Sequence, residues 1–372
     1  MKYYLSRPKI DQNDIDSVVN VLRSPNLSLG PKINEFEQAL AQYSNKKYCA
    51  VVNSGTSALH LALLAKNITK TSDEVIVPSF TFIATSNVVI HAGGTPIFVD
   101  ADENSYNITP DTIMEKINSN TKAIIPVDVF GRPIDEKGIQ DIAEDHSLFL
   151  LRDSCEALGT KVDGKHIGEL SDAITFAFYP NKQITTGEGG ALLTDDDYLI
   201  KQVASLRNQG RGDSTEWLTH DKIGFNYRMS DINAALGLSQ LNKIEEIIDK
   251  KQRIVNLYNQ AFSSTSYIKT PTSNQNERIS WFVYTIQVDF NQSKLKNRDE
   301  LVTKLKENGI QAGRYFSPVH LQPIYQKLYN YKSGDFPITE KLGEEVLALP
   351  FHLDLEKEHI SDIVNTIISI VD

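Results

Sequence analysis

The chain has 372 residues, of which 40% are hydrophobic and 23% are charged, and its formal net charge at pH 7 is −10. This composition is typical of a globular protein, and the length allows a large and a small domain with substantial cores. The acidic balance argues against non-specific binding to nucleic acid or to an anionic membrane. An anionic ligand would therefore need a local basic cluster.

Cysteine usage and the N-terminal sequence predict a cytoplasmic protein. The two cysteines, Cys49 and Cys155, lie in apolar or strand-end contexts without CxxC spacing, so we expect buried, reduced thiols. The N-terminus, MKYYLSRPKI, has no apolar signal core, and no apolar run approaches the length of a membrane span. No histidine and cysteine spacing suggests zinc, so we expect no metal site.

The first part of the chain alternates between helical and strand-like patterns. Apolar residues at helical spacing predict helices at 14–22 and 33–43. Short apolar runs predict strands at 48–52, 74–77, 96–99, 122–127, 148–151, 174–179 and 191–194. Such alternation indicates an α/β fold with a mainly parallel sheet between helices.

The second part begins with a long helical pattern over 230–262, followed by a polar, turn-rich stretch over 263–280. A strand is predicted at 281–288, and helices are predicted near 298–308 and 339–347. We therefore predict a large domain over residues 1–250, including an N-terminal helical segment, and a smaller C-terminal α/β domain over residues 251–372.

One lysine lies between an aromatic-rich strand and a glycine-rich turn. The segment 178–190 reads FYPNKQITTGEGG and contains Lys182. A lysine fixed by packing beneath a tight turn is kept partly desolvated, which favours the neutral amine that forms a Schiff base with an aldehyde. For an isolated lysine, a surface position beside a hairpin is the commoner explanation. The interpretation therefore depends on the motifs around it.

An aspartate ends the apolar run FLLRD, which places Asp153 at the carboxyl end of a predicted buried strand. Ligands of open α/β sheets usually bind at this edge. A carboxylate there could pair with a protonated pyridine nitrogen. The alternative is that Asp153 caps a strand end or a helix start.

A third motif, NSGTSALHLALLA over 53–65, follows a short predicted strand and continues into a helical pattern. The first amides of a helix carry partial positive charge and lack intrahelical acceptors, so they suit a phosphate monoester. Gly55, Thr56 and Ser57 would add close backbone approach and hydroxyl groups. A simple helix N-cap would look similar.

The order of these three motifs resembles that of fold-type I pyridoxal phosphate enzymes, and the chain resembles the DegT/StrS family of sugar aminotransferases over nearly its full length. Further segments that resemble this family lie at 78–102, 206–211, 224–241 and 317–325. The resemblance implies a fold-type I aminotransferase with a large domain, a smaller C-terminal domain and pyridoxal 5′-phosphate as cofactor.

The resemblance also implies individual roles. Lys182 matches the lysine that forms the Schiff base and moves the proton between cofactor and substrate carbons. Asp153 matches the partner of the pyridinium nitrogen. Phe82 matches an aromatic position that stacks on the cofactor ring, although a phenylalanine in PSFTF would also suit the core. Gly55, Thr56 and Ser57 match the phosphate site.

Asn226 matches a residue that the neighbouring subunit offers to the phosphate, which implies a homodimer with a shared active site. Two positions depart from the family pattern. Many relatives have histidine or glutamine where this chain has Glu156, so this carboxyl group is either partly protonated or tied to a donor. Many relatives also have serine where this chain has Ala177, so the phosphate would depend more on the helix start and on Asn226.

Candidate substrate residues are Arg228, Tyr315 and His320. Arg228 belongs to a group with Arg207 and Arg211 that could meet an anionic substrate or form surface ion pairs. Tyr315 and His320 lie in a segment that resembles the family's sugar site. His320 would contact a sugar hydroxyl or phosphate, or else make only a structural hydrogen bond.

The implied reaction transfers an amino group from an amino acid, with L-glutamate expected, to a nucleotide-linked keto sugar in polysaccharide or glycan precursor biosynthesis. Lys182 groups the chain with transaminases, because relatives with histidine at this position act as dehydratases. The GEGG turn over 187–190 resembles members that aminate C4 of a 4-keto-6-deoxy sugar. The alternatives are a C3 keto-sugar or keto-cyclitol aminotransferase and, from a different class, a non-catalytic sensor that retains the cofactor pocket.

Overall fold

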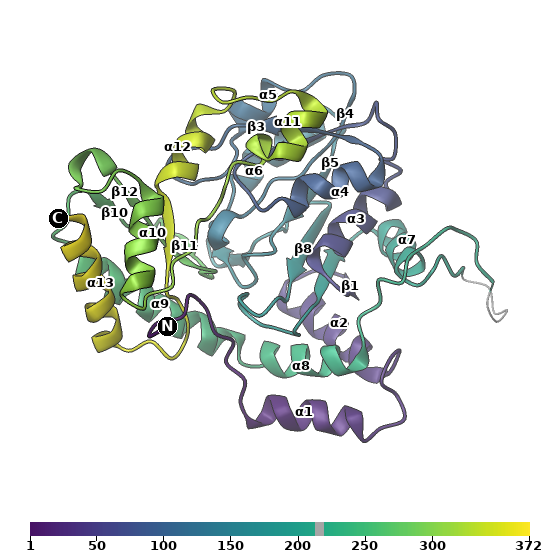
Figure 1. Cartoon of the computed structure of the whole chain (residues 1–372). Coiled ribbons are helices and arrows are strands. Elements are labelled where there is room, and N and C mark those ends of the chain that lie inside the picture. The colour runs from purple at the N-terminus through teal and green to yellow at the C-terminus, as the bar shows by residue number, and fades with distance from the viewer. Residues whose placement is uncertain (213–218) are drawn as a thin grey trace.

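The computed structural model describes residues 1–212 and 219–372 (Figure 1). The strands are β1 (Tyr48–Val52), β2 (Glu74–Pro78), β3 (Thr95–Val99), β4 (Thr121–Ile124), β5 (Phe149–Asp153), β6 (Lys161–Val162), β7 (Lys165–His166), β8 (Ala173–Ala177), β9 (Gly190–Thr194), β10 (Ile268–Lys269), β11 (Glu277–Arg278), β12 (Tyr284–Val288) and β13 (Val346–Leu349). The α-helices are α1 (Gln12–Leu22), α2 (Pro31–Tyr43), α3 (Gly55–Ala65), α4 (Ala84–Ala92), α5 (Pro110–Met114), α6 (Glu136–Asp145), α7 (Asp197–Arg207), α8 (Asp231–Leu241), α9 (Ile244–Phe262), α10 (Arg298–Glu307), α11 (Pro323–Tyr329), α12 (Pro337–Glu345) and α13 (Lys357–Val371).

The central sheet has the strand order β1-β9-β8-β5-β4-β2-β3. From β8 to β3 the neighbouring strands are parallel, whereas β9 runs antiparallel to both β8 and β1. The predicted mainly parallel α/β sheet is therefore confirmed, and the predicted strands on either side of the Lys182 turn are β8 and β9.

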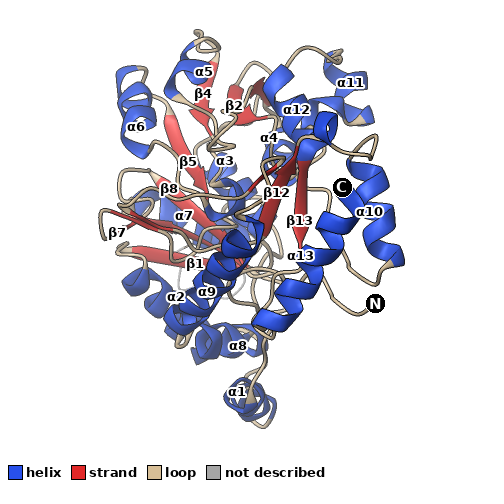
Figure 2. Ribbon diagram, turned by 90° about the vertical axis from the view of Figure 1, so that its left-hand side faces the viewer, coloured by secondary structure: helices blue, strands red, loops and turns tan. Residues whose placement is uncertain are grey.

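Helices cover both faces of this sheet, as Figure 2 shows. Alternate residues of a strand point to opposite faces. Val75 and Leu151 pack with apolar residues of α3, α4 and α7, whereas Ile76 and Leu150 pack with α5 and α6 on the other face. Burial on both faces explains why these strands read as continuous apolar runs.

The C-terminal part is built on the antiparallel sheet β10-β12-β13, which packs with α9, α10 and α13 around a separate apolar cluster. Tyr3 from the N-terminal segment joins this cluster. The predicted boundary at residue 250 falls within α9, which passes from one part to the other.

None of the helices in the described ranges combines the length and the apolar character needed to cross a membrane.

Two predicted helices differ from the structure. The pattern over 230–262 is divided into α8 and α9, because the backbone at Lys243 is not helical. The Lys243 ammonium group pairs with Asp11, which precedes α1, and with Asp14 in its first turn. The helix predicted over 339–347 ends at Glu345, and Val346–Leu349 forms β13, paired with β12. A short apolar run after a helix has no distinctive local signal, so its pairing partner decides its structure.

A buried ion network lies at the carboxyl end of β5. Arg152 is fully buried, and its guanidinium group contacts Asp128 (Nη2–Oδ1, 2.7 Å) and Glu136 (Nη1–Oε2, 2.6 Å). Asp128 also accepts hydrogen bonds from the Ser154 hydroxyl and from the amide of Ile134 (3.1 Å). The network therefore fixes the segment 128–136 against β5.

We expect Arg152→Ala to destabilise the protein by about 3–5 kcal/mol, because it leaves buried carboxylates without a counter-charge. Urea unfolding of both proteins would measure this difference. The matched control is Lys137→Ala, which removes an exposed pair with Asp141 and should cost less than about 0.5 kcal/mol. Equal effects of the two substitutions would contradict a structural role for the network.

Candidate active site

A cavity of about 480 Å³ lies beside the carboxyl end of β5 and the turn between β8 and β9. Its wall combines the start of α3, the loop before α4, the Lys182 turn and two segments of the C-terminal part. Among its lining residues are Gly55, Thr56, Phe82, Asp153, Glu156, Lys182, Phe282 and Tyr315. The sequence motifs that are far apart in the chain therefore meet around one cavity.

Lys182 is held in the β8–β9 turn, where its amide donates to the Tyr179 carbonyl (2.9 Å). The side chain is only 13% exposed. Its Nζ lies 3.3 Å from Glu156 Oε1 and 4.0 Å from the centroid of the Phe282 ring. The amine thus faces one carboxylate and one aromatic ring instead of bulk water.

Asp153 is the last residue of β5 and is buried. Its Oδ2 accepts from the Thr85 hydroxyl (2.8 Å), and its Oδ1 accepts from the Cys155 amide (3.1 Å). Burial raises the pKa of Asp153, while hydrogen bonds from Cys155 and Thr85 and the charge of Lys182 offset part of this rise. These donors orient a carboxyl group that lines the cavity.

Glu156 is also buried, and each of its oxygens has a donor. Oε2 accepts from the Phe130 amide (2.9 Å), and Oε1 faces Lys182. Burial raises the pKa of Glu156, and the nearby charge of Lys182 acts in the opposite direction. Of the two states considered from the sequence, a carboxyl group tied to donors matches these contacts.

The start of α3 presents its first turn to the cavity. Ser54 caps the helix by accepting from the Ser57 amide (3.1 Å), and Gly55 and Thr56 line the cavity wall. Gly55 is required here because a Cβ atom would lie 2.8 Å from both Ala177 Cβ and Cys155 Sγ. Ala177 therefore contributes to the close packing of α3 against β8.

Ser57 differs from this pattern, because its hydroxyl group is engaged within the protein. It donates to Asn53 Oδ1 (2.7 Å) and lies 2.9 Å from Ser54 Oγ, and the residue is buried outside the cavity lining. In this arrangement Ser57 shapes the helix start, and the residues of the helix start that line the cavity are Ser54, Gly55 and Thr56.

The two aromatic candidates both line the cavity. Phe82 is 59% exposed, so it is not a core residue, while the neighbouring Phe80 is fully buried. Tyr315 is half-buried, and burial raises the pKa of its hydroxyl group. An exposed aromatic ring at a cavity mouth can stack on a flat ligand.

His320 requires a correction. The ring is completely buried, its Nδ1 lies 2.6 Å from Ser79 Oγ, and its Nε2 lies 3.1 Å from Glu340 Oε1. A histidine with both nitrogens occupied and no exposed surface does not contact a substrate. His320 makes the structural hydrogen bonds that the sequence left as the alternative.

Arg228 and Asn226 lie outside this cavity. The Arg228 guanidinium group donates to Asn208 Oδ1 (2.9 Å) in a separate surface pocket, and Asn226 is exposed. Asn226 was expected to act in a neighbouring subunit, so its distance from the cavity of its own chain does not test that role.

Sequence reasoning missed Thr85 and Phe282. Thr85 lies three residues after Phe82, and its hydroxyl holds Asp153 only because α4 begins beside the end of β5. Phe282 precedes β12 in the C-terminal part, and no local pattern connects it to Lys182.

Among the described residues, no group of three or more histidine, cysteine or acidic side chains is arranged to hold a metal ion.

Comparison with known proteins agrees with this geometry. Residues 8–368 match the model of the DegT/DnrJ/EryC1/StrS aminotransferase family. The chain is 36% identical over 362 residues to GDP-perosamine synthase of Caulobacter vibrioides, covering 97% of this chain and 96% of that protein. Helicobacter pylori PseC, an aminotransferase involved in the biosynthesis of pseudoaminic acid, is 29% identical with a TM-score of 0.93 over 100% of this chain and 99% of that chain.

The chain belongs to the DegT/DnrJ/EryC1/StrS aminotransferase family. It is therefore a fold-type I sugar aminotransferase of nucleotide-sugar or polysaccharide biosynthesis, and its cofactor is pyridoxal phosphate. Spr1654, a putative sugar aminotransferase from Streptococcus pneumoniae, is solved in both PLP and PMP forms. The PLP form is 28% identical with a TM-score of 0.93, covering 100% of this chain and 98% of that chain.

The cavity fits this cofactor. An exposed aromatic ring, a buried carboxyl group and a lysine amine border the same space, and the first turn of α3 offers amides without intrahelical acceptors. These groups suit a flat, phosphorylated pyridine aldehyde.

We expect Gly190→Ala to weaken pyridoxal phosphate binding by at least about tenfold, because a new Cβ would lie 2.5 Å from the backbone of Ser54 and Gly55 and displace the start of α3. Absorbance titration of cofactor-free protein would measure the affinity. Gly164→Ala is the control for an added methyl group away from the site: a Cβ there meets nothing within 4 Å, and the φ of +78° strains only the local turn between β6 and β7, so cofactor affinity should not change. An unchanged affinity in Gly190→Ala would show that the helix start does not need its present position.

Proposed function

We propose that the protein transfers an amino group from L-glutamate to C4 of a nucleotide-linked 4-keto-6-deoxy sugar. The observation that carries this proposal is that Lys182 and Asp153 border the same cavity as the first turn of α3 and the exposed ring of Phe82. Acceptors in which the ketone lies at C3, or in a cyclitol, are the alternatives within the same chemistry.

Pyridoxal phosphate, when bound, supplies an aldehyde carbon for amines and an electron sink for the bond that breaks at the substrate carbon. Asp153 would hold the proton of the pyridine nitrogen, with its own orientation fixed by Thr85 and Cys155. Gly55 and Thr56 would bind the phosphate through the helix start, and Phe82 would cover the ring.

Lys182 would carry the proton between the two reacting carbons with its Nζ. Glu156 Oε1 lies 3.3 Å from this amine and would keep the free lysine in a defined position. Phe282 and Tyr315 close the wall on the side of the C-terminal part and help to exclude water.

The acceptor class is supported by relatives named as GDP-perosamine synthases from three bacteria, which are 34–36% identical to this chain. The position of amination is supported only by the resemblance of the GEGG turn over 187–190 to family members that aminate C4 of a keto sugar. Tyr315 is the remaining substrate candidate on the wall of this chain's own cavity.

The shared site of a homodimer is the second element of the proposal. Asn226 and Arg228 lie in a segment outside the cavity of their own chain, near Ile223, whose side chain is 94% exposed. A partner that buries this apolar side chain would receive Asn226 at its phosphate site and Arg228 beside its substrate.

We expect Lys182→Ala to lower amino transfer by at least about 1,000-fold, because no other residue of this wall supplies a lysine amine in the proposed steps. The assay is 2-oxoglutarate release from L-glutamate with C4-keto and C3-keto nucleotide sugars and a keto-cyclitol as acceptors. Lys137→Ala is an exposed-lysine control that should retain activity. Full turnover in Lys182→Ala would refute the assignment, and preference for a C3-keto acceptor would refute amination at C4.

We expect a heterodimer of Lys182→Ala with Asn226→Ala to have about half of the wild-type activity per dimer, although each variant alone is impaired. One site of this heterodimer has both defects and the other has neither. Co-expression with two different affinity tags would isolate it. A heterodimer as inactive as its parents, or a fully active Asn226→Ala, would contradict the shared site.

A further inference from the structure

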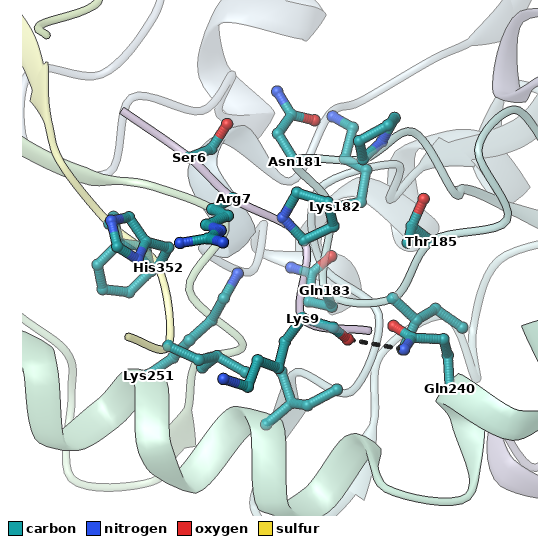
Figure 3. A pocket seen from close by; sticks show the side chains of 16 residues that line it. Ser6, Arg7, Lys9, Asn181, Lys182, Gln183, Thr185, Gln240, Lys251 and His352 are labelled. Atoms are coloured by element: carbon teal, nitrogen blue, oxygen red, sulfur yellow. Dashed lines mark hydrogen bonds between the residues drawn. The ribbon is translucent and has the colours of Figure 1, made fainter. Parts of the chain in front are cut away.

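A second, much smaller cavity shares two wall residues, Asn181 and Lys182, with the large one. Its volume is about 30 Å³, which exceeds the space that one water molecule needs. The N-terminal segment at Arg7, the Lys182 turn, α9 at Lys251 and the segment after β13 at His352 form its walls. Figure 3 shows the Lys251 side chain extending from α9 toward Arg7. Four separate segments of the chain therefore meet around this cavity.

The wall of the small cavity is basic, although the whole chain has a net charge of −10. Of the 16 described residues that line it, four are lysine or arginine and none is acidic. These four are Arg7, Lys9, Lys182 and Lys251. Arg7 and Lys9 share one carboxylate, that of Asp354, and Lys182 pairs with Glu156. The carboxylates next to this wall are therefore fewer than its basic side chains.

Lys251 is the basic side chain of this wall that is buried without a carboxylate. Only 5% of the residue is exposed. Its Nζ donates to the Trp281 carbonyl (3.1 Å) and lies 5.3 Å from the centroid of the Phe351 ring. None of its contacts within the described part of the chain is with an acidic side chain. A buried ammonium group is unfavourable without a counter-charge, so this amine either gives up its proton or acquires an anion.

Two further polar atoms of the lining residues are buried and have no hydrogen-bond partner among the described residues. They are His352 Nδ1 and Asn181 Oδ1. Buried polar atoms are normally paired with the protein or with a bound species. A neutral imidazole can carry its proton on Nδ1, and a side-chain amide can turn to present its NH₂ group. Both side chains can therefore act as donors to the same ligand as Lys251.

We propose that the small cavity is a binding site for a small monovalent inorganic anion such as chloride, with the Lys251 ammonium group as its main ligand. The excess of basic side chains on the wall favours an anion over loss of the Lys251 proton. The volume favours a single small ion over a phosphate ester. The ion joins the N-terminal segment and the segment after β13 to α9, and the site does not depend on the proposed amino transfer.

Diffraction from holoenzyme crystals grown in sodium bromide tests the site directly. We expect an anomalous bromide peak inside the cavity, within hydrogen-bonding distance of Lys251 Nζ. Lys251→Met should lose this peak, because the main ligand is removed. Lys250→Met is the matched control and should keep it, since Lys250 pairs with Glu246 on the exposed side of α9. A water molecule alone in the wild-type cavity would overturn the proposal.

Thermal unfolding of the holoenzyme measures the same binding in solution. An anion that binds only the folded chain raises the Tm by mass action. Replacing sodium gluconate with sodium chloride at constant ionic strength should raise the wild-type Tm by about 2 °C. Lys250→Met should respond in the same way, whereas Lys251→Met should not respond to chloride.

Two results in solution count against the site. An equal chloride response in wild type and Lys251→Met would mean that the anion binds elsewhere. A bromide peak without any chloride response in the wild type would indicate an adventitious ion only. The wild-type crystals and the wild-type Tm decide between these outcomes even if Lys251→Met fails to fold.

Discussion

The burial of Arg152 at the end of β5 is the constraint on which the site depends. A guanidinium group without access to water requires carboxylates, and Asp128 and Glu136 supply them. This pairing fixes the segment that contains Phe130. The Phe130 amide donates to one oxygen of Glu156, and the other oxygen of Glu156 accepts from the Lys182 amine. The opposite faces of one strand thus carry a structural cation at Arg152 and the cavity carboxylate at Asp153.

Close backbone approach connects the other parts of the site. A Cβ on Gly190 would meet the start of α3 at 2.5 Å, so β9 positions the first helical turn directly. A Cβ on Gly131, whose φ is +89°, would lie 2.3 Å from the Ser280 carbonyl oxygen. The segment beside the Arg152 network therefore packs on the chain just before Phe282, and it brings an aromatic ring of the C-terminal part to Lys182.

The charges around Lys182 are arranged in layers. Asp153 and Glu156 face the large cavity, and burial raises the pKa of both. Lys251, on α9, lines a smaller cavity that Lys182 also borders. Burial and the charge of Lys182 lower the pKa of Lys251 to about 7. Because each of these groups is shielded from water, each responds to the protonation of its neighbours more strongly than a surface group would.

The sequence by itself determined the α/β class, most strands of the central sheet, the family and the identity of Lys182, Asp153 and the α3 start as candidates, because apolar periodicity and short motifs are local properties. It did not determine that 230–262 breaks at Lys243, that Val346–Leu349 pairs with β12, or that His320 is sealed between Ser79 and Glu340. Thr85, Phe282 and Lys251 also have no local signal. Only the tertiary structure decided their contacts, since hydrogen bonding, burial and charge coupling depend on which distant segments the fold brings within a few ångströms.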